Sequence, residues 1–222
     1  MKPSLDNIKA LVFDAYGTLL DVKSLDERLT HHFGEQASQI NSIWRQKQLQ
    51  YTWLRSLMDR YKPFSQITRE ALEFACRDTE VELTEEIMAD LMDHYFVLNS
   101  FPEVPELLKK LSKSHACAIL SNADMPMLQK ACDHNGISQF LNAILTVDSV
   151  QINKPAPQVY QLATQHFQCE KGEIAFISSN TWDVAGAKSF GLKSIWLNRS
   201  NGTMETMGFK PDWIIGGLSD LL

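Results

Sequence analysis

Residues 8–20 read IKALVFDAYGTLL, and this pattern sets the class of structure that the chain can form. The first six residues are a short apolar run, which is typical of a strand buried on both faces of a parallel sheet. Asp14 follows the run at once, and Gly17 then allows the backbone to turn closely. We therefore expect a first strand over residues 8–13, with the carboxylate of Asp14 at its carboxyl end.

The second half of the chain alternates between strand-like and helical patterns from residue 107 onward. Short apolar runs occur at residues 116–120, 143–147, 174–177, 194–197 and 213–215, with helical stretches between them. Such alternation predicts an α/β fold with a doubly wound parallel sheet and a Rossmann-like core. We expect residues 1–19 and 99–222 to form this core domain.

The segment between these two parts, residues 20–98, has a different character. It lacks strand-like runs, and its apolar spacing favours helices, notably over residues 40–57, 67–76 and 87–98. Because it is inserted directly after the first strand, we expect a helical cap domain that lies over the carboxyl end of that strand.

Composition restricts the classes of function. The 222 residues are 44% hydrophobic, and the formal net charge of −6 provides no basic footprint for nucleic acid and no attraction to anionic membranes. No apolar run approaches the ~18 residues of a membrane span, and the start of the chain does not resemble a secretory signal. We expect a cytoplasmic enzyme whose four scattered cysteines are free and buried.

Polar residues cluster after four of the predicted strands. They are Asp14 to Thr18, Ser121 and Asn122, Lys154, and Ser178 to Asp183. Ligands of open α/β sheets bind outside the carboxyl ends of the strands, and these ends share one edge of the sheet. We therefore expect the four clusters to form a single site.

The same clusters carry a resemblance to a known family. FDAYGTLL, LSNAD, NKPAPQVY and FISSNTWDVAGAKSFGL resemble, in order, the four motifs of the haloacid dehalogenase (HAD) superfamily. With WRQKQLQYTWLR, LNRSN and PDW, the sequence is most similar to the (S)-2-haloacid dehalogenases over essentially the whole chain. The resemblance implies a HAD-like fold with a helical cap, and commonly a homodimer. The implied reaction converts (S)-2-haloalkanoic acids to (R)-2-hydroxy acids and halide through an aspartyl ester.

Two departures separate the chain from the phosphatases of that superfamily. Those enzymes carry a second Asp two residues after the nucleophile and a Gly-Asp pair in the fourth motif, where this chain has Tyr16 and the pair Ser178 and Ser179. Since magnesium prefers carboxylate ligands, we expect no metal and no cofactor. A halide leaves as an anion, so a carbon–halogen bond needs no proton donor.

Two alternatives compete with this hypothesis. One is a magnesium-dependent phosphatase or phosphonate hydrolase of the same fold, against which Tyr16 and Ser179 argue. The other is a non-catalytic carboxylate-binding protein, against which the intact set of Asp14, Lys154 and Asp183 argues.

The resemblance assigns the main chemical steps to three residues. Asp14 would attack the carbon that bears the halogen, and Lys154 would orient it and offset its repulsion from the anionic substrate. Asp183 would pair with Lys154 and activate the water that opens the ester at the aspartyl carbonyl, so that the carbon is inverted once. The simpler interpretations are a turn-capping Asp14, a solvated Lys154 and a helix first-turn Asp183.

Further roles follow from matched positions. Thr18 would fix the rotamer of Asp14, Asn180 would donate to the halide or position water, and Ser178 belongs to the same catalytic set. The resemblance places substrate contacts at Ala15, Tyr16, Arg45, Leu49, Phe64, Ser121, Asn122, Tyr160 and Trp182. The simpler interpretation of Arg45 is an exposed helix residue, and core packing explains Tyr160 and the apolar members equally well.

Overall fold

A parallel six-stranded sheet forms the centre of the computed structural model, which describes residues 2–222. The strand order is β3-β2-β1-β4-β5-β6, and every neighbouring pair is parallel. The strands are β1 Ala10–Phe13, β2 Ala116–Ser121, β3 Ala143–Thr146, β4 Ile174–Ser178, β5 Lys193–Leu197 and β6 Trp213–Ile215. The predicted doubly wound α/β fold is therefore confirmed.

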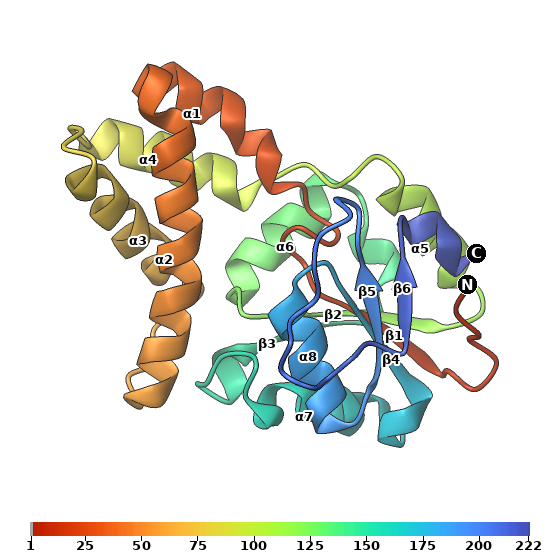
Figure 1. Ribbon diagram of the computed structural model, residues 1–222. Coiled ribbons are helices and arrows are strands. Elements are labelled where there is room, and N and C mark those ends of the chain that lie inside the picture. Colours follow the sequence, from red (N-terminus) through yellow and green to blue (C-terminus); the bar gives the residue numbers. More distant parts are fainter. Residues whose placement is uncertain (1) are drawn as a thin grey trace.

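Four helices cover the two faces of the sheet (Figure 1). They are α5 Val104–Leu111, α6 Met125–His134, α7 Pro157–Phe167 and α8 Thr181–Phe190. Leu11 and Phe13 of β1 point into the cluster that contains α5 and α6, whereas Ala10 and Val12 point into the cluster with α7 and α8. Successive side chains of a strand face opposite sides, so β1 is buried on both faces as its apolar sequence requires.

The remaining helices form a separate lobe beside the sheet (Figure 1). They are α1 Asp26–Phe33, α2 Ala37–Leu57, α3 Phe64–Asp78 and α4 Glu85–Phe96, all inserted between β1 and β2. This lobe is the predicted helical cap. The two lobes share one apolar cluster, in which Trp44 and Leu91 of the cap belong with Phe13 of the sheet. The domain limits at 19/20 and 98/99 stay a prediction.

Some details differ from the sequence-based expectations. Helix α5 was not predicted, although its buried residues Val104, Leu107, Leu108 and Leu111 have helical spacing. Cys169 is only half-buried, so the expectation of four buried cysteines is wrong at that position. Among residues 2–222, no helix combines the length and apolar character of a membrane span.

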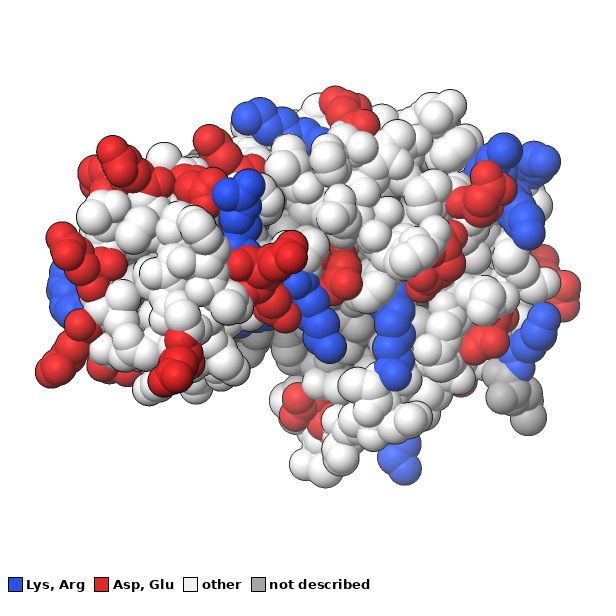
Figure 2. Space-filling view, turned by 90° about the horizontal axis from the view of Figure 1, so that it is seen from above, with Lys and Arg blue, Asp and Glu red and all other residues white. Residues whose placement is uncertain are grey.

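The charged side chains are mixed in sign over the molecular surface. In Figure 2, acidic groups gather on the cap lobe at the left, and both signs are interspersed over the core lobe. The described residues form no continuous basic stripe on this face.

Candidate active site

The site lies at the switch point of the sheet, where ligands of α/β folds usually bind. From β1 the chain builds β2 and β3 on one side and β4 to β6 on the other. Asp14 follows β1, Ser121 ends β2 and Ser178 ends β4, so three of the predicted clusters meet at adjacent strand ends. Lys154 reaches the same place from the segment between β3 and α7.

A tight turn after β1 presents backbone donors beside Asp14. Gly17 has a φ of +84°, a left-handed conformation that favours glycine, and its N–H donates to the carbonyl of Leu20 at 2.8 Å. The N–H of Leu20 donates back to the carbonyl of Ala15 at 3.0 Å. Within residues 2–222 the N–H groups of Ala15 and Tyr16 have no hydrogen-bond acceptor. Two donors are thus available to an anion next to the carboxylate.

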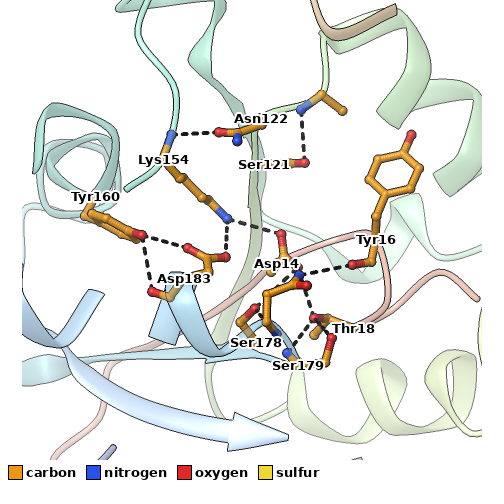
Figure 3. A network of polar contacts seen from close by, with 12 residues as sticks. Asp14, Tyr16, Thr18, Ser121, Asn122, Lys154, Tyr160, Ser178, Ser179 and Asp183 are labelled. Atoms are coloured by element: carbon orange, nitrogen blue, oxygen red, sulfur yellow. Dashed lines mark hydrogen bonds and ion pairs between the residues drawn. The ribbon is translucent and has the colours of Figure 1, made fainter. Parts of the chain in front are cut away.

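The carboxylate of Asp14 is only 6% exposed and is held by four side chains. Its Oδ2 accepts from Asn180 Nδ2 at 2.9 Å, from Thr18 Oγ1 at 3.1 Å and from Ser178 Oγ at 3.4 Å. Its Oδ1 accepts only from Lys154 Nζ, at 3.2 Å (Figure 3). The donors fix the carboxylate in one orientation and leave Oδ1 as the oxygen with spare lone pairs.

Lys154 bridges two carboxylates inside the protein. Its Nζ lies 3.2 Å from Asp14 Oδ1 and 2.9 Å from Asp183 Oδ2, and the residue is 1% exposed. Burial opposes the charge of Lys154, but the carboxylates of Asp183 and Asp14 outweigh burial and raise its pKa above the ordinary value. Its backbone N–H donates to Asn122 Oδ1 at 2.8 Å. The ammonium is therefore fixed in place and protonated at neutral pH.

Asp183 lies in the first turn of α8 and is fully buried. Its Oδ1 accepts a hydrogen bond of 2.7 Å from the hydroxyl of Tyr160 (Figure 3). Burial raises the pKa of Asp183 to about 6, and the charge of Asp14 adds to the rise, although Lys154 and Tyr160 oppose it. Asp183 is thus both a first-turn carboxylate and an ion-pair partner of Lys154.

For Tyr160 the sequence allows two interpretations, a polar contact in the site and packing in the core, and the structure shows features of both. Its ring is fully buried and packs edge-on against Phe176, with the ring centroids 5.6 Å apart. Its hydroxyl nevertheless bonds the side chain and the carbonyl oxygen of Asp183. The residue is a core residue that positions Asp183.

A cavity of about 50 Å³ lies against Asp14. Ten of the predicted residues line it: Asp14, Tyr16, Arg45, Leu49, Phe64, Ser121, Asn122, Lys154, Asn180 and Trp182. Thr18, Ser178 and Asp183 are not part of this lining but hold Asp14 or Lys154, and Tyr160 holds Asp183 in turn. Most of the predicted set therefore converges on one small space.

Arg45 brings a positive charge to this cavity from helix α2 of the cap. It is half-buried, and within residues 2–222 it forms no ion pair with a carboxylate. Arg55, which lies on the same helix as Arg45, does form an ion pair, with Glu70 of α3. A guanidinium without an acidic partner, facing a cavity, is suited to an anionic ligand.

The comparisons with known proteins agree with this geometry. The sequence model of the haloacid dehalogenase-like hydrolases matches residues 8–191. The chain belongs to this family.

Relatives of known function match over almost the full length. An (S)-2-haloacid dehalogenase of Pseudomonas sp. (strain YL) is 42% identical over 96% of this chain and 93% of its own. An L-2-haloacid dehalogenase of Xanthobacter autotrophicus, solved with chloropropionic acid covalently bound, shares 34% identity and a TM-score of 0.92 over 96% of each chain. Another solved dehalogenase has 38% identity and a TM-score of 0.94, covering 97% of this chain and 96% of its own.

Some residues of this dehalogenase-like hydrolase were not anticipated from sequence. Gln48 and Tyr95 also line the cavity; Gln48 is buried on α2 and donates to Thr68 Oγ1 at 3.0 Å. A polar residue four positions after the buried Trp44, on the same helix face, is the signal that could have identified it. Arg199 donates to the carbonyls of Gly17 and Thr18 at 3.1 and 3.0 Å and thereby fixes the turn after β1.

Asn180 is placed differently from the expected role at the halide. Its Nδ2 donates to Asp14 Oδ2 at 2.9 Å and to the carbonyl of Tyr16 at 3.4 Å. In this arrangement the amide group of Asn180 holds the nucleophile and the turn after β1.

The residues around Asp14 do not fit the divalent cation that phosphatases of this superfamily use. Asp14 Oδ2 and the carbonyl of Tyr16 accept hydrogen bonds from protein donors. The Tyr16 side chain stacks on Tyr95 with the ring centroids 5.3 Å apart, so it offers no carboxylate beside Asp14. Ser179 contributes a hydroxyl that lies 3.3 Å from Thr18 Oγ1. We therefore derive no chemical step through a metal.

Proposed function

We propose that the protein is a metal-independent (S)-2-haloacid dehalogenase, which hydrolyses (S)-2-haloalkanoic acids to (R)-2-hydroxy acids and halide. The observation that carries the proposal is the environment of Asp14. Its carboxylate is fixed by Lys154, Asn180 and Thr18 and lines a small cavity that the guanidinium-bearing Arg45 also lines. The names of the relatives support the same reaction.

In the first step Oδ1 of Asp14 attacks the carbon that bears the halogen. A new carbon–oxygen bond forms, and the halide leaves with the bonding electrons of the carbon–halogen bond. The substrate carboxylate binds the free N–H groups of Ala15 and Tyr16 and the hydroxyl of Ser121, which lines the cavity. The Xanthobacter relative, with chloropropionic acid covalently bound, supports a covalent intermediate.

Arg45 and Asn122 are the groups proposed to receive the halide. Asn122 uses its Oδ1 to accept from the backbone of Lys154, so its Nδ2 is the part of the amide that remains to donate. The Nδ2 of Asn180, by contrast, donates to Asp14 and to the carbonyl of Tyr16. Donors placed where negative charge develops lower the barrier of the displacement.

The second step releases the product from Asp14. Asp183 accepts a proton from a water molecule, whose oxygen attacks the carbonyl carbon of the aspartyl ester. The bond between that carbon and the substrate oxygen breaks, and the departing alkoxide takes the proton back from Asp183, which gives the hydroxy acid and restores the carboxylate of Asp14. Lys154 stays protonated and balances the charge of both carboxylates throughout. Attack at the carbonyl rather than at the substrate carbon leaves a single inversion.

A single turnover in heavy-oxygen water tests the ester. With enzyme in excess over (S)-2-chloropropanoate, the hydroxy acid should carry unlabelled oxygen, and the peptide that contains Asp14 should gain the label. Asp14→Asn should stop halide release, whereas the same change at the exposed Asp6 should leave it intact. Label that enters the hydroxy acid directly in the first turnover would overturn the proposal.

We also propose that the protein is a cytoplasmic homodimer. A half-buried aromatic pair on the cap is a candidate for the interface: Tyr51 of α2 and Phe74 of α3 pack edge-on, with 6.5 Å between their ring centroids. The four cysteines form no disulfide among residues 2–222, which suits a reducing compartment. Light scattering should give twice the chain mass, and Phe74→Glu should halve it. A wild-type protein of single chain mass would contradict the dimer.

A further inference from the structure

A second, apolar cavity adjoins the catalytic one. Its volume is about 460 Å³, and its lining includes Trp53, Leu57, Ile152, Ala156 and Met207. Lys154 and Trp182 line both cavities, so the two spaces lie on either side of these residues. We call the second space the outer cavity.

Helix α2 connects the two cavities along one of its faces. Leu49 lines the catalytic cavity, and Trp53 and Leu57 line the outer one. Residues four apart lie above one another on a helix, so these three form an apolar stripe about 12 Å long. Leu57 is 84% exposed at the outer end. The stripe thus leads from the reacting carbon to the solvent.

The catalytic cavity is too small for a long substrate. On the same measure of volume, one water molecule needs about 10–15 Å³, so 50 Å³ holds roughly four water-sized groups. A carboxylate, the reacting carbon and a halogen fill that space. Any longer alkyl chain must therefore lie elsewhere.

Trp182 and Lys154 separate the two cavities, and Trp53 supports Trp182 from the outer side. Trp53 packs edge-on against Trp182, with the ring centroids 5.6 Å apart. The indole N–H of Trp53 is buried and has no hydrogen-bond acceptor within residues 2–222. The Trp53 ring is therefore held by packing alone, and its displacement breaks no hydrogen bond.

We propose that the outer cavity binds the alkyl chain of longer linear 2-haloalkanoic acids, which passes Trp182 and lies along Trp53 and Leu57. The inference rests on the proposed function and adds a chain-length subsite to it. Each methylene that is buried there should improve kcat/KM by about fourfold.

The test compares (S)-2-chlorohexanoate with (S)-2-chloropropanoate. The readout is the ratio of their kcat/KM values, because general effects on the chemistry cancel in it. The double variant Leu57→Glu/Met207→Glu places charge at the mouth of the outer cavity, where both residues are exposed. Leu54→Glu/Met58→Glu is the matched control, with the same residue types exposed outside both cavities. Calorimetric titration with hexanoate and propanoate measures the same preference without turnover.

We expect the wild type and the control to favour the six-carbon acids, and the ratio to fall about tenfold or more in the Leu57/Met207 variant. A wild type without this preference, or equal ratios in both variants, would overturn the subsite. If the ratio is unchanged but light scattering shows loss of a dimer, a second copy of the chain covers the cavity instead. If no chloroacid is hydrolysed but hexanoate still binds better than propanoate, the proposed function fails and the subsite stands.

Discussion

Lys154 is the residue on which the charge balance of the site depends. One ammonium lies between two carboxylates, those of Asp14 and Asp183, so the buried trio carries one net negative charge. A substrate carboxylate adds another. The free guanidinium of Arg45 is the available compensation, which explains why the cap must deliver it to the cavity.

The first prediction concerns pH. Because burial raises the pKa of Asp183 to about 6, acidification below that value protonates the base and removes one of the anions beside Lys154. The rate of hydrolysis under saturating substrate should therefore fall on the acid side, with a midpoint at or below pH 6, because the ester removes the charge of Asp14 that adds to the rise. The hydrogen bond from Tyr160 lowers the pKa of Asp183, so Tyr160→Phe should move this midpoint to higher pH.

Tyr51→Phe is the control for that experiment, because it removes a tyrosine hydroxyl from α2 at a residue that does not line the catalytic cavity. The rate of hydrolysis by Tyr51→Phe should fall at the same acidic pH as that of the wild type. An unchanged midpoint in Tyr160→Phe, or an acid limb retained in Asp183→Asn, would show that another group titrates.

The three charged residues of the site could be predicted from the sequence, whereas the residues that hold or surround them could be predicted less well. Asp14, Lys154 and Asp183 were predicted because each follows a strand-like run or lies in a motif. The role of Asn180 as a clamp on Asp14 depends on how the ends of β1 and β4 lie side by side, and the presence of Gln48 in the cavity depends on how α2 lies over the sheet. No local pattern encodes that arrangement.

At the scale of elements, the contact between α7 and α8 sets the position of Asp183. Gly186 lies in α8 against Tyr160 of α7, and an added Cβ would lie 2.7 Å from Pro155 Cβ and 3.0 Å from Tyr160 Cζ. The absence of a side chain at this point is what allows Tyr160 to reach Asp183.

The second prediction follows from this close approach. Gly186→Ala should lower the free energy of unfolding by about 1–3 kcal/mol, since an overpacked core must shift side chains. It should also displace Tyr160 and raise the acid midpoint of the rate. Gly172→Ala is the matched control, because its added Cβ would meet no atom within 4 Å. Equal stability of the two variants in urea would contradict the packing argument.

The strands were predicted to within about two residues because each is a compact apolar run flanked by turns. The cap helices were less certain at their ends. Helix α3 begins at Phe64, three residues before the predicted start, because Pro63 precedes it and its first turn packs on the cavity. Burial between lobes, rather than local periodicity, determines that boundary.

At the scale of the whole molecule, polar contacts join the cap to the core around the cavity. The N–H of Ser65 donates to Asp124 Oδ2 at 2.9 Å, and Ser56 Oγ accepts from the backbone of Asn153 at 3.0 Å. The hydroxyl of Tyr61 donates to Asp148. These contacts hold α2 and α3 over the strand ends, where Arg45 and Phe64 complete the cavity.

The third prediction concerns this junction. Tyr61→Phe should weaken the contact between cap and core by about 1 kcal/mol, which is the usual net contribution of one hydrogen bond. Hydrogen exchange should quicken in residues 56–66, and KM should rise severalfold with little change in kcat. Tyr51→Phe should alter neither quantity. Exchange that quickens equally throughout the chain would point to general destabilisation instead.

The small volume of the catalytic cavity also determines the order in which halide leaves and water enters. Bound haloacid occupies the room, so the hydrolytic water can enter only after the ejected anion has departed. Anion and water therefore compete for the same space beside the ester of Asp14. Added bromide at saturating substrate should prolong the lifetime of the ester, which rapid-quench sampling would record as its accumulation.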